Sequence, residues 1–320
     1  MNGTHYDMRI RPQTLFTAVL GVALMVVAGC EGKIQAKVSG VPVYAGPHRT
    51  SSQLPPRLTE LRDALVAPQA QTLSGPELSG LPARVAQATE DAAAGGAALS
   101  VAILDRTTHQ LVSSGTSEIV GTASVAKLFI ADDLLLQDSQ GKTALTSDDR
   151  QALDTMLQSS DDDAAEKFWD QDGEAAIITE VAGRYGLTST APPSDGRWWN
   201  TISSVTDLVR YYEMLLDGSG GLPAERAKII VNDLARSTPT GSDGYPQRFG
   251  IPDGLYAEPV AVKQGWMCCI GTDWVHLSTG VIGPDHRYIM VVQSLQSSDD
   301  ATARETITQA VKTIFPHGRI

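Results

Sequence analysis

The chain has 320 residues, of which 42% are hydrophobic and 19% are charged, so it has enough apolar material for a globular core. Its 25 basic and 37 acidic residues give a net charge of -12, which makes it a poor binder of the phosphate backbone of nucleic acids. Its three cysteines are too few for a disulfide-stabilised scaffold.

The first segment of the chain has the pattern of an export signal. Two arginines precede an uncharged apolar run over residues 15–28, which is short for a bilayer span. The run ends in VAGC at residues 27–30, and a small residue directly before a Cys resembles a bacterial lipobox. We therefore expect a lipoprotein signal peptide over residues 1–29. Acyl chains on Cys30 would hold the protein on the outer face of the plasma membrane; an ordinary signal peptide with a chance Cys is the alternative.

The rest of the chain divides into a tether and a folded domain. Residues 30–80 are rich in Pro, Ser, Gln and Gly and predict a flexible, lipid-anchored tether with one short helix at 57–66. The domain is expected over residues 81–320. Periodicity and capping residues predict, in chain order, helix 81–94, two strands within 97–114, helices 124–136, 147–157, 163–169, 174–185 and 205–216, strands 260–267, 273–282 and 287–295, and helix 301–315.

The order of these elements predicts the fold class. Strands come at both ends of the domain, with a long helical block between them. This order is typical of an α+β fold, with an antiparallel sheet flanked by helices and an inserted helical subdomain.

One short motif carries residues that suit nucleophilic catalysis. In Ser124-Val125-Ala126-Lys127, the Ser opens an apolar helix whose N-terminus offers backbone N–H groups to a developing anion. Lys127 lies one turn later on the same face, where a buried lysine could lose its proton and activate the Ser124 hydroxyl. Taken alone, the motif also fits a Ser cap and a Lys whose tip reaches solvent.

Two further motifs have simpler explanations when each is taken alone. Ser160-Asp161-Asp162 lies between two predicted helices, where it would be an acidic cap of the second helix. Lys263-Gln264-Gly265 lies on a late strand, where an exposed Lys before a bulge or turn Gly is the simpler explanation. Only the order of the three motifs along the chain favours a shared role.

That order resembles the S-x-x-K, S-D-N and K-T-G motifs of serine β-lactamases and penicillin-binding proteins. The resemblance runs from about Leu81 to the C-terminus and includes the segments GTASVAKLF, MLQSSDDDAAEKF and VKQGW. It implies a β-lactamase/transpeptidase-like fold, no metal or other cofactor, and a β-lactam or a peptidoglycan-type peptide as ligand. The acidic, alanine-rich chain with its lipobox is also similar to a group of mycobacterial lipoproteins.

The resemblance implies a role for each motif residue. Ser124 would be the acylated nucleophile, Lys127 its base, and Ser160 the relay of a proton to the leaving group. Lys263 would bind the substrate carboxylate. A backbone N–H after Gly265 would complete the oxyanion hole with that of Ser124.

Two departures from the family pattern affect the chemistry directly. Asp162 replaces the Asn of the second motif in the substrate-binding region. Its carboxylate should favour the charged form of Lys127 and repel an anionic substrate. No E-x-x-x-N segment follows between Trp169 and Asn200, so the carboxylate that positions the deacylating water in class A enzymes is missing.

Two further departures concern the walls of the cleft. Gln264 replaces the usual Thr or Ser of the third motif, and the bulky Trp266 and Met267 follow Gly265. The spacing from the first motif to the second is also shorter than in typical class A enzymes, so part of one wall could be missing.

These observations lead to one expectation and one alternative. We expect an envelope lipoprotein with degenerate motifs, weak or no β-lactam hydrolysis, and acyl-serine chemistry on another amide or ester. The alternative is a non-catalytic module that kept the cleft to bind a ligand or peptidoglycan. A Ser-His-Asp hydrolase is disfavoured, because the chain has no G-x-S-x-G and because His276 and His286 read as strand and turn residues.

The two remaining cysteines are adjacent. Cys268 and Cys269 are either two thiols or a vicinal disulfide. Since no Cys or His lies near them at metal-ligand spacing, a zinc site is not expected.

Overall fold

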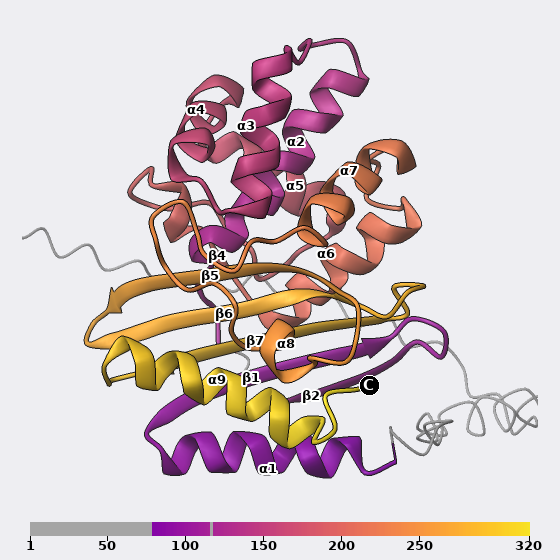
Figure 1. The fold of residues 1–320 in the computed structure, drawn as a ribbon. Coiled ribbons are helices and arrows are strands. Elements are labelled where there is room, and N and C mark those ends of the chain that lie inside the picture. Colours follow the sequence, from indigo (N-terminus) through magenta and orange to yellow (C-terminus); the bar gives the residue numbers. More distant parts are fainter. Residues whose placement is uncertain (1–78, 116–117) are drawn as a thin grey trace, which may run out of the picture. The chain divides into compact units, whose positions relative to one another are not determined.

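The computed structural model describes residues 79–115 and 118–320. Within them lies a five-stranded sheet with the strand order β2-β1-β7-β6-β5, antiparallel throughout. Its strands are β1 (Ala97–Asp105), β2 (Gln110–Ser114), β5 (Val260–Ile270), β6 (Asp273–Ile282) and β7 (Tyr288–Gln296). β1 pairs with β7, so strands from both ends of the domain build one sheet, as predicted (Figure 1).

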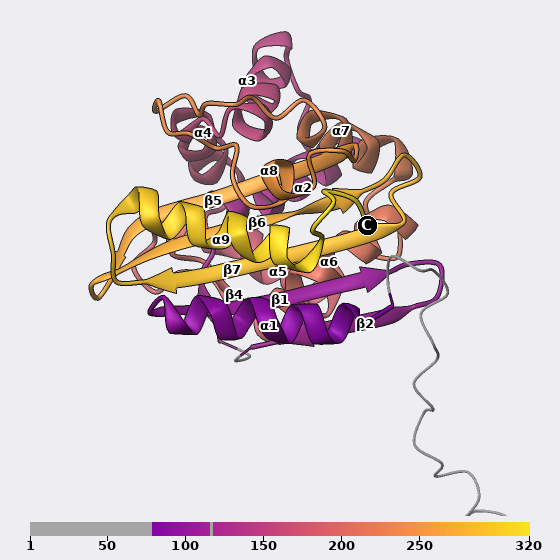
Figure 2. The same ribbon diagram turned by 60° about the horizontal axis from the view of Figure 1, so that its bottom comes forward.

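Helices cover both faces of this sheet (Figures 1 and 2). One face carries α1 (Leu81–Ala94) and α9 (Asp300–Ile314), which pack against each other, with the short α8 (Ile251–Gly254) beside α9. The other face carries the helical block, formed by α2 (Lys127–Ser139), α3 (Ser147–Gln158), α4 (Asp162–Asp172), α5 (Ala175–Tyr185), α6 (Val205–Asp217) and α7 (Ala224–Leu234). The α+β fold class with an inserted helical subdomain is confirmed.

Two hydrophobic cores result from this arrangement, one on each side of the sheet. Successive side chains of a strand point to opposite faces. On β1, Ala102 and Leu104 therefore join the core under the helical block, whereas Val101 and Ile103 join the core against α1 and α9. Burial on both faces explains why the inner strands β1 and β7 are rich in apolar residues on both faces.

The central helix α2 is buried over the whole of residues 127–136, as the sequence predicted for this segment. Its start differs from the prediction. Ser124 lies inside a 3₁₀ turn, η2 (Ala123–Ala126), and the α-helix begins only at Lys127. Short 3₁₀ turns are frequent at the N-termini of α-helices, and sequence periodicity does not distinguish the two.

Other boundaries also shift. The helix expected at 163–169 runs from Asp162 to Asp172, and its N-cap Asp161 accepts a hydrogen bond from the N–H of Ala164 at 2.8 Å. Helix α7 was not predicted, although Ala227, Ile230, Val231 and Leu234 are buried at the spacing of an amphipathic helix. That signal was present in the sequence and was missed.

Some predictions fall on residues that the structure does not describe. The signal peptide, Cys30 and the short helix at 57–66 lie outside the described ranges, so the division into leader, tether and domain stays a prediction. Among residues 79–115 and 118–320, no helix has the length and apolar character needed to cross a membrane.

A buried carboxylate joins three helices of the helical block. Asp132 of α2 is fully buried, and it accepts hydrogen bonds from Arg184 and Tyr185 of α5 and from Tyr211 of α6. Burial raises the pKa of Asp132, and the Arg184 guanidinium acts in the opposite direction. The position of α2, and with it of the residues at its N-terminus, therefore depends on this group.

We predict that Asp132→Ala lowers the free energy of unfolding by about 3 kcal/mol, because it leaves the largely buried Arg184 charge with only the more distant and exposed Glu180 carboxylate, 3.9 Å away. Urea denaturation of the domain measures this loss. Glu90→Ala, on the exposed side of α1, is the control and should change stability by less than about 0.5 kcal/mol. Equal effects of the two substitutions would show that Asp132 does not hold the helices together.

Candidate functional site

Ser124 lies in the turn between a short strand and α2. The strand β3 (Val120–Gly121) pairs with β4 (Ile202–Ser203), and the N–H of Thr122 donates to the carbonyl of Thr201 at 2.7 Å. The Ser124 residue is 7% exposed. This turn is therefore anchored on both sides, which fixes the position of the Ser124 hydroxyl.

Gly265 allows strand β5 to pass directly beside this turn. A Cβ at Gly265 would lie 2.6 Å from the carbonyl oxygen of Thr122 and 3.2 Å from a methyl carbon of Val125. Real Cβ atoms essentially never come within 3.0 Å of another atom, so the approach to the Thr122 carbonyl means that a side chain at this position would force the strand and the turn apart. The Gly of the third motif is thus required for packing against the turn that carries Ser124, not for a bulge.

Lys127 joins the first two motifs. Its side chain is 0% exposed. The amine Nζ donates to Ser124 Oγ at 2.9 Å, to the Ser160 carbonyl at 2.7 Å and to Asp162 Oδ1 at 2.5 Å. The shorter spacing between the motifs therefore still brings Ser160 and Asp162 to the lysine.

The third motif reaches the same place from the sheet. Lys263 is 1% exposed, and its Nζ donates to Ser160 Oγ at 2.8 Å. Lys127 Nζ lies 3.2 Å from the same Ser160 Oγ. The Ser160 hydroxyl thus bridges two lysines, in a backbone conformation with φ of 57° that is rare for a residue with a side chain. Ser124, Lys127, Ser160 and Lys263 form one continuous chain of hydrogen bonds.

Burial determines the direction of both lysine pKa values. It lowers the pKa of Lys127 from its ordinary value, and the Asp162 carboxylate opposes this shift without reversing it. The pKa of Lys263 lies well below its ordinary value, because that lysine is buried and has the Lys127 charge nearby. The expected contact between Asp162 and Lys127 is present, but the net shift favours the neutral amine. A neutral amine 2.9 Å from a hydroxyl can accept its proton.

A pocket of about 220 Å³ opens onto Ser124. Two of its lining residues are acidic, three are tryptophans and none is basic. They are Ala123, Ser124, Asp162, Trp198, Trp199, Asp243, Trp266 and Met267. The tryptophans at 198 and 199 and Asp243 were not among the predicted site residues, and the only signal for the first two was the Trp-Trp pair after a loop of Pro, Ser, Asp and Gly.

Trp198 occupies the region beside Lys127. It belongs to the 3₁₀ turn η3 (Trp198–Asn200), and its ring centre lies 4.7 Å from Lys127 Nζ. Its indole N–H donates to Glu166 of α4 at 2.9 Å. The loop that lacks the E-x-x-x-N segment thus presents an indole to the lysine.

Gln264 and Trp266 point to different surroundings. Gln264 is buried, and its amide donates to the carbonyl of Phe249 at 2.5 Å. It supplies no hydroxyl to the pocket. Trp266 stacks on Tyr245 with ring centres 4.6 Å apart, and its indole N–H donates to Asp243 at 3.3 Å.

His276 lies on β6 in a separate buried cluster. Its Nε2 is 2.7 Å from the Tyr245 hydroxyl and 3.5 Å from Asp300. Burial lowers the pKa of His276 to about 4, so it is neutral at physiological pH. Because its partners are a tyrosine and a carboxylate, while Ser124 is bonded to Lys127, the geometry does not support a Ser-His-Asp arrangement around Ser124.

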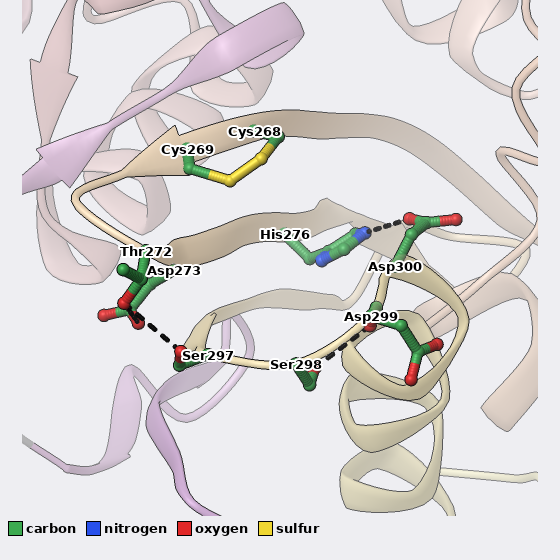
Figure 3. Close-up of a disulfide and its surroundings, with 9 residues drawn as sticks. All are labelled: Cys268, Cys269, Thr272, Asp273, His276, Ser297, Ser298, Asp299 and Asp300. Atoms are coloured by element: carbon green, nitrogen blue, oxygen red, sulfur yellow. Dashed lines mark hydrogen bonds and ion pairs between the residues drawn. A yellow bond between two sulfur atoms is a disulfide. The ribbon is translucent and has the colours of Figure 1, made fainter.

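The adjacent cysteines form a disulfide at the end of β5 (Figure 3). Cys268 and Cys269 are both exposed, and they follow Met267 of the pocket lining directly. Among the residues described, no group of three or more His, Cys, Asp or Glu side chains is placed to hold a metal ion.

Comparison with solved structures identifies the fold. A β-lactamase from Chitinophaga pinensis is 16% identical with a TM-score of 0.61, and the match covers 73% of this chain and 98% of that one. The penicillin-binding protein PBP-A is 17% identical with a TM-score of 0.60, over 75% and 96% of the two chains. The domain therefore has the serine β-lactamase/penicillin-binding-protein fold, as the three motifs predicted.

Comparison of sequences identifies the family. No protein-family model matches the chain. The proteins named "Putative lipoprotein LppW" of Mycobacterium tuberculosis and Mycobacterium bovis are 64% identical over 319 residues, which is 98% of this chain and 100% of each relative. At this identity over the whole length, the chain belongs to the LppW lipoprotein family.

Proposed function

We propose that this protein forms a covalent acyl-enzyme at Ser124, with an amide or ester as acyl donor, and hydrolyses it slowly. The contact that carries the proposal is the 2.9 Å hydrogen bond between Ser124 Oγ and the amine of Lys127. Full burial of that amine supports its use as a base, because desolvation disfavours the ammonium form.

The acylation step follows from the contacts around the two motifs. Ser124 Oγ attacks the carbonyl carbon while its proton passes to Lys127 Nζ. The bond from that carbon to the leaving nitrogen or oxygen then breaks, and the leaving group takes a proton from Ser160 Oγ. Ser160 recovers a proton from Lys127, 3.2 Å away, so no external acid is consumed. A backbone N–H after Gly265, together with that of Ser124, would bind the negative charge that develops on the attacked carbonyl oxygen.

Slow release of the acyl group is proposed from the residues beside Lys127. Hydrolysis needs a base that positions water against the ester carbonyl. Trp198 fills the space 4.7 Å from Lys127 Nζ, and the two carboxylates that line the pocket, Asp162 and Asp243, are held by hydrogen bonds from Lys127, Tyr245 and Trp266. β-Lactam hydrolysis would accordingly be weak.

We also propose that acyl chains on Cys30 anchor the protein on the outer face of the plasma membrane. The lipobox-like VAGC segment and the relatives named as lipoproteins support this proposal. The peptidoglycan-type ligand implied by the motif resemblance would be within reach from that location.

We predict that benzylpenicillin and a fluorophosphonate probe each add one adduct mass to the domain, and that Ser124→Ala removes both adducts. Benzylpenicillin is a suitable probe because a variant of PBP-A, which shares the fold at 16% identity, is known as an acyl-enzyme complex with penicillin G. Intact-mass spectrometry measures the adduct, and its persistence over hours measures deacylation.

The controls separate catalysis from folding and from binding. Ser159→Ala changes a half-buried serine next to the second motif. Its hydroxyl bonds to Thr155 and Ser242 and not to the two lysines, so the substitution should leave labelling intact. An adduct that survives in Ser124→Ala would place the nucleophile elsewhere. No adduct with either reagent in a folded sample would favour the non-catalytic binding module instead.

We predict that Asp162→Asn accelerates acylation of Ser124 at neutral pH. The Asp162 carboxylate raises the pKa of Lys127, so its removal lets that pKa fall further and enlarges the neutral fraction. Because the neutral amine is the base, the acylation rate rises with pH through the pKa of Lys127. The rising limb of the rate profile should therefore move to lower pH in the variant.

Asp163→Asn is the matched control, since it removes the same charge from the next position of α4. The rate of adduct formation between pH 5 and pH 10 is the measurement for both variants. An unchanged rate profile in a normally folded Asp162→Asn variant would mean that this carboxylate does not set the pKa of the group that acts as the base.

A further inference from the structure

The charges around the pocket indicate what kind of ligand it accepts. Asp162 and Asp243 both line it, and no lysine or arginine does. Lys127 and Lys263, the two lysines of the motifs, lie behind the pocket wall and are 0% and 1% exposed. Their amines share the buried Ser160 hydroxyl as a hydrogen-bond partner and do not line the opening. A ligand that enters the pocket therefore meets carboxylates and indoles.

The charge of Asp243 is held in place without being neutralised. One carboxylate oxygen accepts the N–H of Tyr245 at 2.9 Å, and the other accepts the indole N–H of Trp266 at 3.3 Å. Both donors are neutral. They orient the carboxylate at the pocket but leave its negative charge available to a ligand.

The charge of Asp162 is only partly compensated. One of its oxygens bonds to Lys127 Nζ, yet 66% of its side chain remains exposed. Burial lowers the pKa of Lys127 from its ordinary value, and the Asp162 carboxylate opposes this shift. The pocket therefore has two lining carboxylates, Asp162 and Asp243, that burial does not shield from a ligand.

The aromatic residues of the pocket strengthen this preference. Ring faces of tryptophan attract cations. Trp198 already lies over the Lys127 amine, and the Arg197 guanidinium lies 5.7 Å from the Trp199 ring centre. Arg197 does not line the pocket. Its guanidinium is therefore a cation near one of these rings that leaves the pocket itself open. One face of the Trp266 ring is covered by Tyr245, and the ring lines the pocket beside Asp243.

The third motif offers little to an anion. The Gln264 amide that replaces a hydroxyl donates to the Phe249 carbonyl. Lys263 Nζ donates to Ser160 and to the carbonyl of Gln264 at 3.1 Å. An anionic group of a substrate would have to approach two aspartates to reach that buried amine.

We infer that the acyl donor of this pocket carries a cationic group, an ammonium or a guanidinium, close to the bond that Ser124 attacks. Asp162, Asp243 and Trp266 would hold that group. This inference rests on the proposed acylation of Ser124 and names the substrate class for it, and it makes Asp243 a residue that determines specificity.

Three penicillins test this inference, because they differ only in one substituent on the same side-chain carbon. Ampicillin carries an ammonium there, benzylpenicillin a hydrogen and carbenicillin a carboxylate. We expect the second-order rate of Ser124 adduct formation to fall in that order, by about tenfold or more from ampicillin to carbenicillin at low salt. The gap should narrow in Asp243→Asn and at high ionic strength.

Asp217→Asn is the matched control. Asp217 is also an exposed aspartate that accepts the N–H two residues later, from Ser219 at 2.7 Å, but it does not line the pocket. It should leave the ratio between the penicillins unchanged. Equal rates for the three penicillins, or a reversed order, would overturn the inference while leaving the proposed acylation in place.

A second measurement does not depend on catalysis. Collisional quenching of tryptophan fluorescence compares the cation caesium with the anion iodide. We expect Asp243→Asn to raise quenching by iodide relative to caesium, because the lining tryptophans lose a negative neighbour, whereas Asp217→Asn should not. If no penicillin labels Ser124, the proposed function fails, and the ratio of iodide to caesium quenching is then the test of the inference. An unchanged ratio in Asp243→Asn would overturn the inference.

Discussion

Burial of the Lys127 amine is the constraint on which the rest of the site depends. A buried amine needs hydrogen-bond partners, since an unpaired one would cost several kcal/mol. The chain supplies them from two directions, with Ser124 in the preceding turn and Ser160 and Asp162 at the start of α4. Ser160 meets this requirement with both its carbonyl and its hydroxyl, in a backbone conformation that is rare outside glycine.

The carboxylate at position 162 has two opposite effects. It gives the Lys127 amine a partner at 2.5 Å, which helps the buried lysine to be tolerated, and it raises the pKa of the amine that we propose as the base. Its exposed side also adds negative charge to the pocket. A single residue therefore links the strength of the base to the charge of the ligand, which an Asn at this position could not do.

The fold could be predicted from the sequence, because its signals are local and strong. The apolar strands, the helix caps and the apolar run of α2 each limit what the backbone can do, and the order of the elements then determines the topology. The site was predictable only in part. The motif residues Ser124, Lys127 and Lys263 come together as expected, but the sign of the net pKa shift of Lys127 depends on how deeply it is buried. The role of Trp198 depends on the path of a loop, which has no periodic signal.

The proposed acylation and the release of the acyl group would depend on different contacts. Acylation would need the Ser124 hydroxyl, the Lys127 amine and the close approach of β5 at Gly265. Release would need a base for water beside Lys127, where the Trp198 indole lies instead, 3% exposed and part of the core under the helical block. Since the loop that carries Trp198 is separate from the turn and the strand that carry Ser124 and Gly265, the residues needed for one step can change without those needed for the other. A fold shared at 16% identity with a β-lactamase is therefore compatible with a site that binds and acylates but releases slowly.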